Sequence, residues 1–387
     1  MSVQDNRQRD LPPTQPLVSI VIPCRNEASC IQACLSSILV QDYPLEKLEV
    51  LIIDGMSNDG TREIVNSIIG RGGEKSCEEN SMGNMQTNIP RKSVSITIID
   101  NPARLVPAAL NIGFECAKGE IIFRLDGHSE LAPNYIRVCV AKLLENSEVG
   151  CVGGPSVASG SGFLGVTYSF ALQSPFGVGG GTFRTARSEQ YVDTLAFGGY
   201  KRRIFKECGP FDLDLARNQD IAFNAKVRKR GYRLLLIPTT FTRYHGPNSL
   251  SQILRQNFWN GYWNASILNK MVGVLSWRHF IPLAFIGFLL FTSFLYLTAD
   301  WGWMPLFLIV GSYLVCSTSM TIREIIKHRK KEAMLLVFLF PAMHLSYGFG
   351  SFVGLLRFLS GVLLKSSIKM FPGKLFHRLK LFGKPIS

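Results

Sequence analysis

The sequence lacks several signatures that would assign it to common functional classes. Its nine cysteines include no C-x-x-C pair, so a zinc site is weakly supported and free thiols in a reducing cytosol are the simpler interpretation. No G-x-G-x-x-G opens a helix after a predicted strand, so a Rossmann dinucleotide site is not indicated. Residues 1–16 carry no signal peptide; they are polar and contain proline, and we expect them to be disordered.

Acidic residues are scarce in the C-terminal part of the 387-residue chain. From Arg323 to Ser387, twelve Lys or Arg stand against two acids, so this segment holds +10 of the net charge of +14. A basic excess can indicate nucleic-acid binding. Here the charge flanks long apolar runs, so we expect a membrane with anionic lipid headgroups as the partner, and no nucleic acid.

Short apolar runs alternate with helical patterns over residues 17–270, which predicts an α/β domain with a mostly parallel sheet. The predicted strands are 17–23, 48–53, 94–99, 120–125, 149–153, 197–200 and 234–237. The predicted helices are 28–39, 61–69, 106–117, 134–145 and 220–230. Two segments are interpreted as loops: an insertion at 70–92, and a glycine-rich stretch at 174–185 that is too glycine-dense for a regular element and is expected to close over substrate.

Three long uncharged runs follow, at 280–299, 302–322 and 333–356, within a membrane region of residues 279–364. Each has about the twenty residues that a bilayer requires. The basic segment at 323–332 predicts a cytoplasmic side for itself and for the N-terminal domain. A third full span would place the basic tail at 365–387 outside. We therefore expect either two short passes broken near Gly348 and Gly350 or an interfacial segment, and prefer a cytoplasmic tail with an interfacial helix near 365–381.

Ligands of open α/β sheets bind beyond the carboxyl ends of the strands. That rule selects three polar clusters here: residues 23–27, 54–55 and 126–128. The carboxylate of Asp126 can reach a divalent metal that bridges two phosphates. His128 can add a nitrogen ligand, which Mn²⁺ tolerates better than Mg²⁺, although alone it is equally consistent with an ordinary hydrogen-bonded histidine.

These clusters carry a family resemblance. The stretch VSIVIPCRNE at 18–27 resembles the opening strand of family 2 glycosyltransferases, and LIIDGMSNDGT at 51–61 resembles their second-strand motif. Asn-Ile-Gly at 111–113, Ala-Lys-Gly at 117–119, Asp126, Phe-Gly-Gly at 197–199 and Gln-Asp at 219–220 continue the pattern in order. The 126–128 cluster and the glycine-rich 176–184 are most similar to the succinoglycan-type exopolysaccharide transferases.

The resemblance implies a GT-A fold that binds a nucleotide-diphosphate sugar with Mg²⁺ or Mn²⁺. The implied donor-site residues are Pro23, Arg25, Glu27, Asp54, Asn111, Arg124 and Asp126. Asp54 would contact the base, and Asp126 would hold the ribose or, with His128, the metal. The family usually has Asp-x-Asp here, so His128 is a departure that leaves the identity of the metal open.

On the acceptor side, the resemblance makes Asp220 the catalytic base, which removes a proton from the attacking hydroxyl. The family commonly has Glu-Asp, whereas Gln219 precedes Asp220 here. A carboxylate at a helix N-terminus is also favoured by the helix dipole, whatever its role. Near the first apolar run, Gln256 is present but Trp259 replaces the Arg of the Gln-x-x-Arg-Trp motif, which argues against a processive synthase.

Two further sets of residues near this region have open roles. Trp259, Tyr262 and Trp263 can stack on sugar rings or form an interfacial aromatic belt. His245 is a weaker candidate near the diphosphate.

The expected activity is therefore an inverting, metal-dependent transfer of one sugar to a lipid-linked or polysaccharide-precursor acceptor. It takes place at the cytoplasmic face of the cell membrane, alongside other polysaccharide-assembly proteins. Two alternatives remain: a synthase of polyprenyl-phosphate sugars, and a non-catalytic membrane scaffold that binds nucleotide sugar. A transporter is disfavoured because no charge lies inside the apolar runs.

Overall fold

A mixed eight-stranded sheet forms the centre of the N-terminal part, in a computed structural model that describes residues 15–73, 94–179, 188–215, 217–266, 268, 277–299 and 301–370. The strand order is β3-β2-β1-β4-β9-β6-β10-β8. The strands are β1 (Val18–Cys24), β2 (Leu48–Asp54), β3 (Ser95–Asp100), β4 (Ile121–Arg124), β6 (Val149–Gly153), β8 (Gln190–Tyr191), β9 (Gly199–Lys201) and β10 (Arg233–Leu236). The first four pair in parallel, whereas β9 is antiparallel to both of its neighbours.

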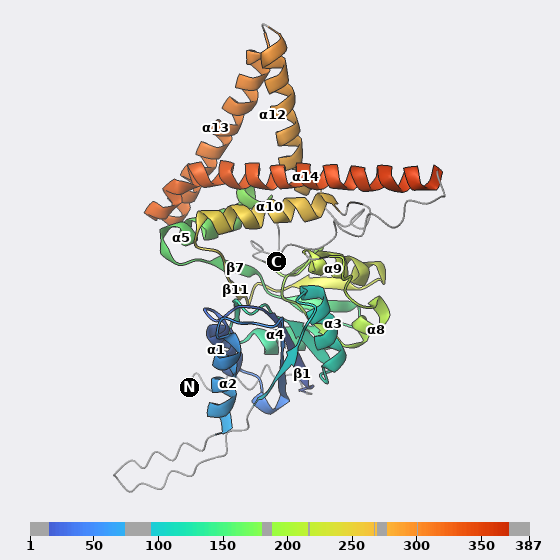
Figure 1. Cartoon of the computed structure of the whole chain (residues 1–387). Helices are drawn as coiled ribbons and strands as arrows, with labels where there is room; N and C mark the ends of the chain where they lie inside the picture. The colour runs from blue at the N-terminus through green and yellow to red at the C-terminus, as the bar shows by residue number, and fades with distance from the viewer. Residues whose placement is uncertain are drawn as a thin grey trace.

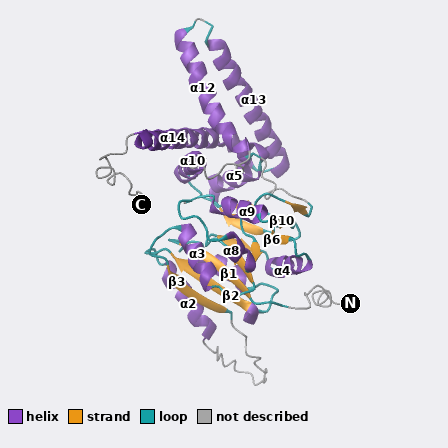
Figure 2. Cartoon of the chain, turned by 90° about the vertical axis from the view of Figure 1, so that its right-hand side faces the viewer, coloured by secondary structure: helices purple, strands orange, loops and turns teal. Residues whose placement is uncertain are grey.

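Helices cover both faces of this sheet (Figures 1 and 2). They are α1 (Ile31–Leu39), α2 (Thr61–Gly73), α3 (Val106–Cys116), α4 (Tyr135–Glu145), α8 (Arg203–Cys208) and α9 (Gln219–Lys229), with a 3₁₀ turn at Leu45–Lys47. Alternate residues of β1 enter two separate cores. Ile20 packs with α1, α2 and α4, and Val21 packs with α3, α8 and α9. Strands buried on both faces have continuous apolar runs, which is why the sequence predicted them.

A smaller sheet lies between this domain and the C-terminal helices. Its order is β5-β11-β7, from Ser129–Leu131, Thr242–His245 and Ser156–Ser159. The helix α5 (Gly162–Gln173) follows β7. The sequence analysis missed all four elements. The three strands have only three or four mostly polar residues, which show no clear period, and they form by pairing with segments far away in the chain.

The C-terminal helices form a hairpin and a crossing pair (Figures 1 and 2). The elements of this region are α10 (Leu250–Ser266), a 3₁₀ turn at Trp277–Phe280, α12 (Ile281–Thr298), α13 (Trp303–His328), a 3₁₀ turn at Lys331–Leu335 and α14 (Leu336–Met370). The short helix α6 (Pro175–Val178) follows α5 earlier in the chain. The hairpin of α12 and α13 points away from the sheet, and α14 runs across its base beside α10. Among the residues that the structure describes, three segments are long and apolar enough to cross a membrane: Trp277–Thr298, Trp303–His328 and Lys331–Ser360.

Three local predictions were wrong. The helix α2 continues through Gly73 into the predicted insertion. Residues Pro175–Val178 of the predicted glycine-rich loop form a helical turn. The helix α14 is unbroken at Gly348 and Gly350, because these glycines lie where neighbouring helices approach its backbone closely rather than at a chain break. The predicted disorder of residues 1–14, the rest of both loops, and residues 371–381 of the interfacial helix lie outside the described residues.

Candidate active site

A cleft opens at the carboxyl ends of the central parallel strands, with a volume of about 180 Å³. Six of the predicted site residues line it: Pro23, Arg25, Glu27, Arg124, Asp126 and His128. Gly55, next to Asp54, also lines it. The parallel pairing of β1 with β2 and β4 places these clusters at one edge of the sheet, as the rule for open α/β sheets predicts.

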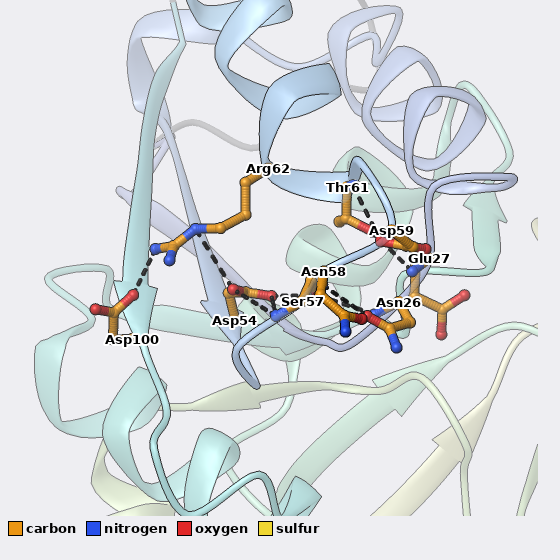
Figure 3. Close-up of polar contacts among 9 residues, drawn as sticks. All are labelled: Asn26, Glu27, Asp54, Ser57, Asn58, Asp59, Thr61, Arg62 and Asp100. Atoms are coloured by element: carbon orange, nitrogen blue, oxygen red, sulfur yellow. Dashed lines mark hydrogen bonds and ion pairs between the residues drawn. The ribbon is translucent and has the colours of Figure 1, made fainter.

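The loops after β1 and β2 hold each other in place (Figure 3). The backbone amide of Asn26 donates to Oγ of Ser57 at 2.9 Å, and the backbone amide of Asn58 donates to the side-chain Oδ1 of Asn26 at 3.0 Å. The amide of Glu27 donates to Oγ1 of Thr61 at 2.9 Å. The first wall of the cleft is therefore fixed by polar side chains of the stretch that resembles the family's second-strand motif.

Asp54 ends β2 and is 1% exposed. Its Oδ2 accepts a hydrogen bond from the amide of Ser57 at 3.1 Å and lies 3.4 Å from Nε of Arg62, which also pairs with Asp100 (Figure 3). Asp54 is not among the residues that line the cleft. In this structure its hydrogen bonds order the loop that begins at Gly55. Contact with the nucleotide base of a donor stays a prediction.

Arg124 is the buried cation of the site. Its Nη2 lies 3.1 Å from Oδ1 of Asp126, and the residue is 8% exposed. Burial opposes its charge, but the nearby carboxylates of Asp126 and Asp220 outweigh that effect and raise its pKa. Nε and Nη1 have no hydrogen-bond partner within the described part of the chain. A buried guanidinium with unpartnered N–H groups is costly, and because Arg124 lines the cleft its positive charge favours an anionic ligand there.

His128 is oriented by Glu27. Its Nδ1 lies 2.8 Å from Oε1 of Glu27, and its ring meets the edge of Tyr244 at a centroid distance of 5.3 Å. Burial acts to lower the pKa of His128, but the hydrogen bond to Glu27 and the charge of Asp126 raise it overall. With Nδ1–H donated to Glu27, Nε2 is the nitrogen that carries the lone pair in the neutral ring.

Asp220 lies in the first turn of α9, directly after Gln219, which lines the cleft. Burial raises the pKa of Asp220, and the charge of Arg124 partly opposes that rise. The structure therefore brings the predicted base close to the Arg124–Asp126 pair, although β4 and α9 are separated by about a quarter of the chain. A carboxylate with a raised pKa is a stronger proton acceptor than an exposed one.

Several candidates are not brought to the cleft. Nδ2 of Asn111 donates to the carbonyl of Phe211 at 3.0 Å, and its Oδ1 accepts from the amide of Phe211 at 2.8 Å, so it joins α3 to the segment before α9. His245 pairs with Glu130, and its amide donates to the carbonyl of His128 at 3.0 Å. The aromatic residues Trp259, Tyr262 and Trp263 lie on α10 beside α14 and do not line the cleft.

Sequence reasoning missed Asn101 and Arg104, which also line the cleft. They follow β3, so the rule that selected the ends of the other strands applies to them too. Asn101 is 2% exposed; its Nδ2 donates to the carbonyl of Leu105 at 3.0 Å, while its Oδ1 has no partner among the described residues. Arg104 has a positive φ of 57°, which places a cation at the entrance in a backbone conformation that is uncommon outside glycine.

A divalent metal fits this site only together with a bound molecule that supplies further oxygen ligands. Within the described ranges, no three or more His, Cys, Asp or Glu side chains gather as a metal site. Asp126 and His128 offer one carboxylate and one imidazole on the same wall. Metals that act on nucleotides commonly take one or two protein ligands and complete their shell with phosphate oxygens and water, so this donor set fits a metal that arrives with a diphosphate.

Residues 19–209 match the family model described as glycosyl transferase family 2. This region is a family 2 glycosyltransferase domain. The chain is 27% identical over 349 residues to a dolichyl N-acetyl-alpha-D-glucosaminyl phosphate 3-beta-D-2,3-diacetamido-2,3-dideoxy-beta-D-glucuronosyltransferase of Methanococcus voltae, covering 88% of this chain and 97% of the relative. It is 28% identical over 267 residues to the succinoglycan biosynthesis protein ExoA of Rhizobium meliloti, covering 68% and 74%.

The fold has a solved counterpart. The mannosyltransferase PcManGT from Pyrobaculum calidifontis, in complex with GDP-Man and Mn²⁺, superposes with a TM-score of 0.54 at 17% identity and covers 90% of this chain and 92% of that one. At this identity the likeness establishes the fold, which is the GT-A fold that the sequence resemblance implied. The family 2 domain is that of a glycosyltransferase with a nucleotide-sugar donor, and the resemblance to the succinoglycan type is confirmed.

Proposed function

We propose that this glycosyltransferase transfers one sugar, with inversion and with a divalent metal, to a lipid-linked acceptor at the cytoplasmic face of the membrane. The observation that carries the proposal is the grouping of Arg124, Asp126 and the helix turn of Asp220 at one end of the sheet. The Methanococcus voltae relative is named for a dolichyl-phosphate-linked acceptor, which supports the lipid-linked class. The three apolar C-terminal segments support a site held beside a membrane.

In this proposal, the cleft residues bind the donor and Asp220 acts on the acceptor. The positive charge of Arg124, which lines the cleft, attracts an anionic group of the donor. Asp220 takes the proton of the acceptor hydroxyl as that hydroxyl attacks the anomeric carbon. Burial raises the pKa of this carboxylate, which makes it a better base.

Asp126 and His128 would hold the metal, with Glu27 fixing the ring of His128 through Nδ1. Bound Mg²⁺ or Mn²⁺ would neutralise the charge that develops on the departing diphosphate. The pair of one carboxylate and one imidazole is compatible with either ion, and the nitrogen ligand favours Mn²⁺.

The experiment measures the release of nucleotide from nucleotide sugars by the purified full-length protein in detergent. A panel of nucleotide sugars is offered with Mn²⁺ or Mg²⁺, with and without membrane lipid extract as the acceptor source. We expect release that requires both metal and lipid extract, and that is lost in Asp126→Ala. Unchanged complementation of a deletion strain by both Asp126→Ala and Asp220→Asn would refute the enzymatic proposal in favour of a scaffold. Full turnover by Asp220→Asn alone would favour a polyprenyl-phosphate acceptor, which is already anionic.

A further inference from the structure

The helices α10 and α14 are packed backbone to backbone. A Cβ atom on Gly261 of α10 would lie 2.0 Å from the carbonyl oxygen of Tyr347 on α14. A Cβ on Gly350 of α14 would lie 2.0 Å from the carbonyl oxygen of Phe258 on α10. Small residues on both helices thus allow a contact that leaves no room for larger side chains. The pair behaves as one rigid unit.

The helix α10 is not suited to the hydrocarbon core of a membrane. It begins a few residues after the small sheet, and Nε2 of Gln256 donates to the hydroxyl of Tyr244 on β11 at 3.0 Å. Its longer polar side chains are Gln252, Arg255, Gln256, Asn257, Asn260 and Asn264. Because polar side chains are expensive in hydrocarbon, α10 stays with the catalytic domain. A partner helix packed along it cannot cross the bilayer independently.

The face of α14 that points away from α10 is apolar and exposed. The exposed fractions are 73% for Phe338, 41% for Leu345, 55% for Phe349 and 51% for Leu356. At 3.6 residues per turn, these four side chains fall within about 20° of one line along the helix. We call these four residues the apolar stripe.

The hairpin and the apolar stripe lie on the same side of the pair. The hairpin rises from α14 on the side away from α10 in Figures 1 and 2. A Cβ on Gly348 would lie 2.4 Å from the carbonyl oxygen of Pro282 on α12, which places this crossing next to the stripe. Only 6% and 11% of the residues in the apolar stretches of α12 and α13 are buried within the protein. The hairpin is therefore the part of the chain suited to cross a bilayer.

We propose that α14 lies in the plane of the membrane surface, with the apolar stripe in the boundary between headgroups and acyl chains, and does not span the bilayer. The partner is a lipid bilayer with anionic headgroups. The proposal rests on the membrane placement of the α12–α13 hairpin given above. A surface helix needs one apolar stripe for lipid and a second face for protein, which is the distribution that α14 shows.

The number of spans tests this proposal directly. The full-length chain carries one epitope tag at each terminus and is placed in sealed inside-out membrane vesicles that are then treated with protease. We expect both tags to be digested, because two spans return the chain to the same side. Protection of only one tag would mean three spans and would overturn the proposal. Sugar transfer measured in the same vesicles before proteolysis reports on the proposed function separately.

A depth measurement supplies a second readout. Positions 338 and 356 are about 27 Å apart along the helix axis at 1.5 Å per residue. A fluorescent non-natural residue placed in turn at each position is quenched by lipids that carry nitroxide groups at graded depths. An in-plane helix gives equal depths at both positions. Depths that differ by about the thickness of the hydrocarbon core would show a spanning helix.

A second inference concerns how the same helix pair holds the turn before Asp220. Asn218 precedes α9 with φ of 57°, and its side chain does not cap that helix. Instead, its Nδ2 donates to Oδ1 of Asn264 on α10. One turn earlier on α10, Oδ1 of Asn260 accepts a hydrogen bond from Nη1 of Arg217 at 2.8 Å. The two residues before Gln219 are therefore both fixed by α10.

The series of side-chain hydrogen bonds continues into α14. Nδ2 of Asn264 donates to the hydroxyl of Tyr347 at 2.6 Å, and Asn264 is 5% exposed. A buried amide that makes hydrogen bonds on both sides has one defined orientation. We infer that Asn264 is a positioning residue: held by Tyr347, it keeps Asn218 in the left-handed turn that presents Asp220. This inference rests on the proposed role of Asp220 as base.

The test compares Asn264→Ala and Tyr347→Phe with Asn257→Ala as the matched control. Asn257 also lies buried on α10, but among the described residues its Nδ2 donates only to the carbonyl of Ile253 on the same helix, at 2.8 Å. We expect both test variants to lower kcat about tenfold with the donor KM unchanged, and the control to retain kcat. A wild-type kcat in Asn264→Ala would overturn the inference, as would an equal loss in the control.

A double variant separates positioning from general destabilisation. Asn218→Gly adopts the left-handed turn without any side-chain hydrogen bond. In that background, Asn264→Ala should cause no further loss of kcat, because the contact it removes is already absent. A further loss of the same size would show that Asn264 acts elsewhere. If Asp220→Asn itself retained full turnover, the proposed base would be wrong, independently of these results.

Discussion

Replacing Asp220 with Asn should separate activity from stability. The side chain keeps its shape and loses its negative charge, so it can no longer accept the proton of the acceptor hydroxyl. General base catalysis contributes about 10²- to 10⁴-fold, which corresponds to about 3 to 5 kcal/mol of activation free energy. We expect kcat to fall by that factor while the KM for the donor changes little.

The stability of this variant follows from the pKa of Asp220. Burial raises that pKa above the ordinary value of 3.8. A raised folded-state pKa stabilises the fold fully below the unfolded-state pKa, and this contribution is lost as the pH rises through the folded-state value. At neutral pH the charged carboxylate is therefore a net cost to folding. Asp220→Asn should melt at the same temperature as the wild type at pH 7, or higher.

The assay pairs transfer rates with thermal unfolding across pH. The control is Asp193→Asn, since the side chain of Asp193 is 75% exposed and pairs with Arg228 only at the surface, at 3.4 Å. The control should retain both activity and melting temperature. An Asp220→Asn variant that is inactive but also clearly less stable at pH 7 would show a structural carboxylate, and would refute the reasoning from burial.

Three further predictions concern residues around the same cleft. Arg124→Gln removes a charge that lowers the pKa of Asp220, so the acid limb of kcat/KM should move to higher pH; an unmoved limb would contradict the coupling. Glu27→Gln should weaken metal activation about 10- to 100-fold, with kcat recovering at saturating Mn²⁺, because the ring of His128 loses its charged partner. Gly113→Val should lower the melting temperature, with a cost of about 1–3 kcal/mol or more, because even its Cβ would lie 2.2 Å from Cγ1 of Val21 in the core; calorimetry that gave a wild-type midpoint would refute this.

The strands β1, β2, β4 and β6 of the central sheet could be predicted because they are buried on both faces. The continuous apolar runs of β1 and β2 end at polar clusters, and the ends of parallel strands share one edge of the sheet. The small sheet could not be predicted in the same way. Its strands β5, β7 and β11 are short and polar, and only their pairing with one another makes them strands.

The structure brings only some of the predicted site residues to the cleft. The clusters at the ends of strands came together, whereas Asn111 joins two protein segments and does not reach the cleft. The same rule would have found Asn101 and Arg104, had the end of β3 been considered alongside the others. A motif marks which residues a family uses, but one sequence does not show which of them point into a cavity.

The sequence by itself determined the α/β domain, its family and the presence of apolar segments, because strand burial, turn chemistry and uncharged runs are local properties of the chain. Only the tertiary structure decided what surrounds Asp220 and what α14 packs against. The pKa of Asp220 depends on Arg124, far away in the sequence, and the placement of α14 depends on its contact with α10. An apolar run of sufficient length fits a span and a surface helix equally well, and the neighbour packed along it distinguishes the two.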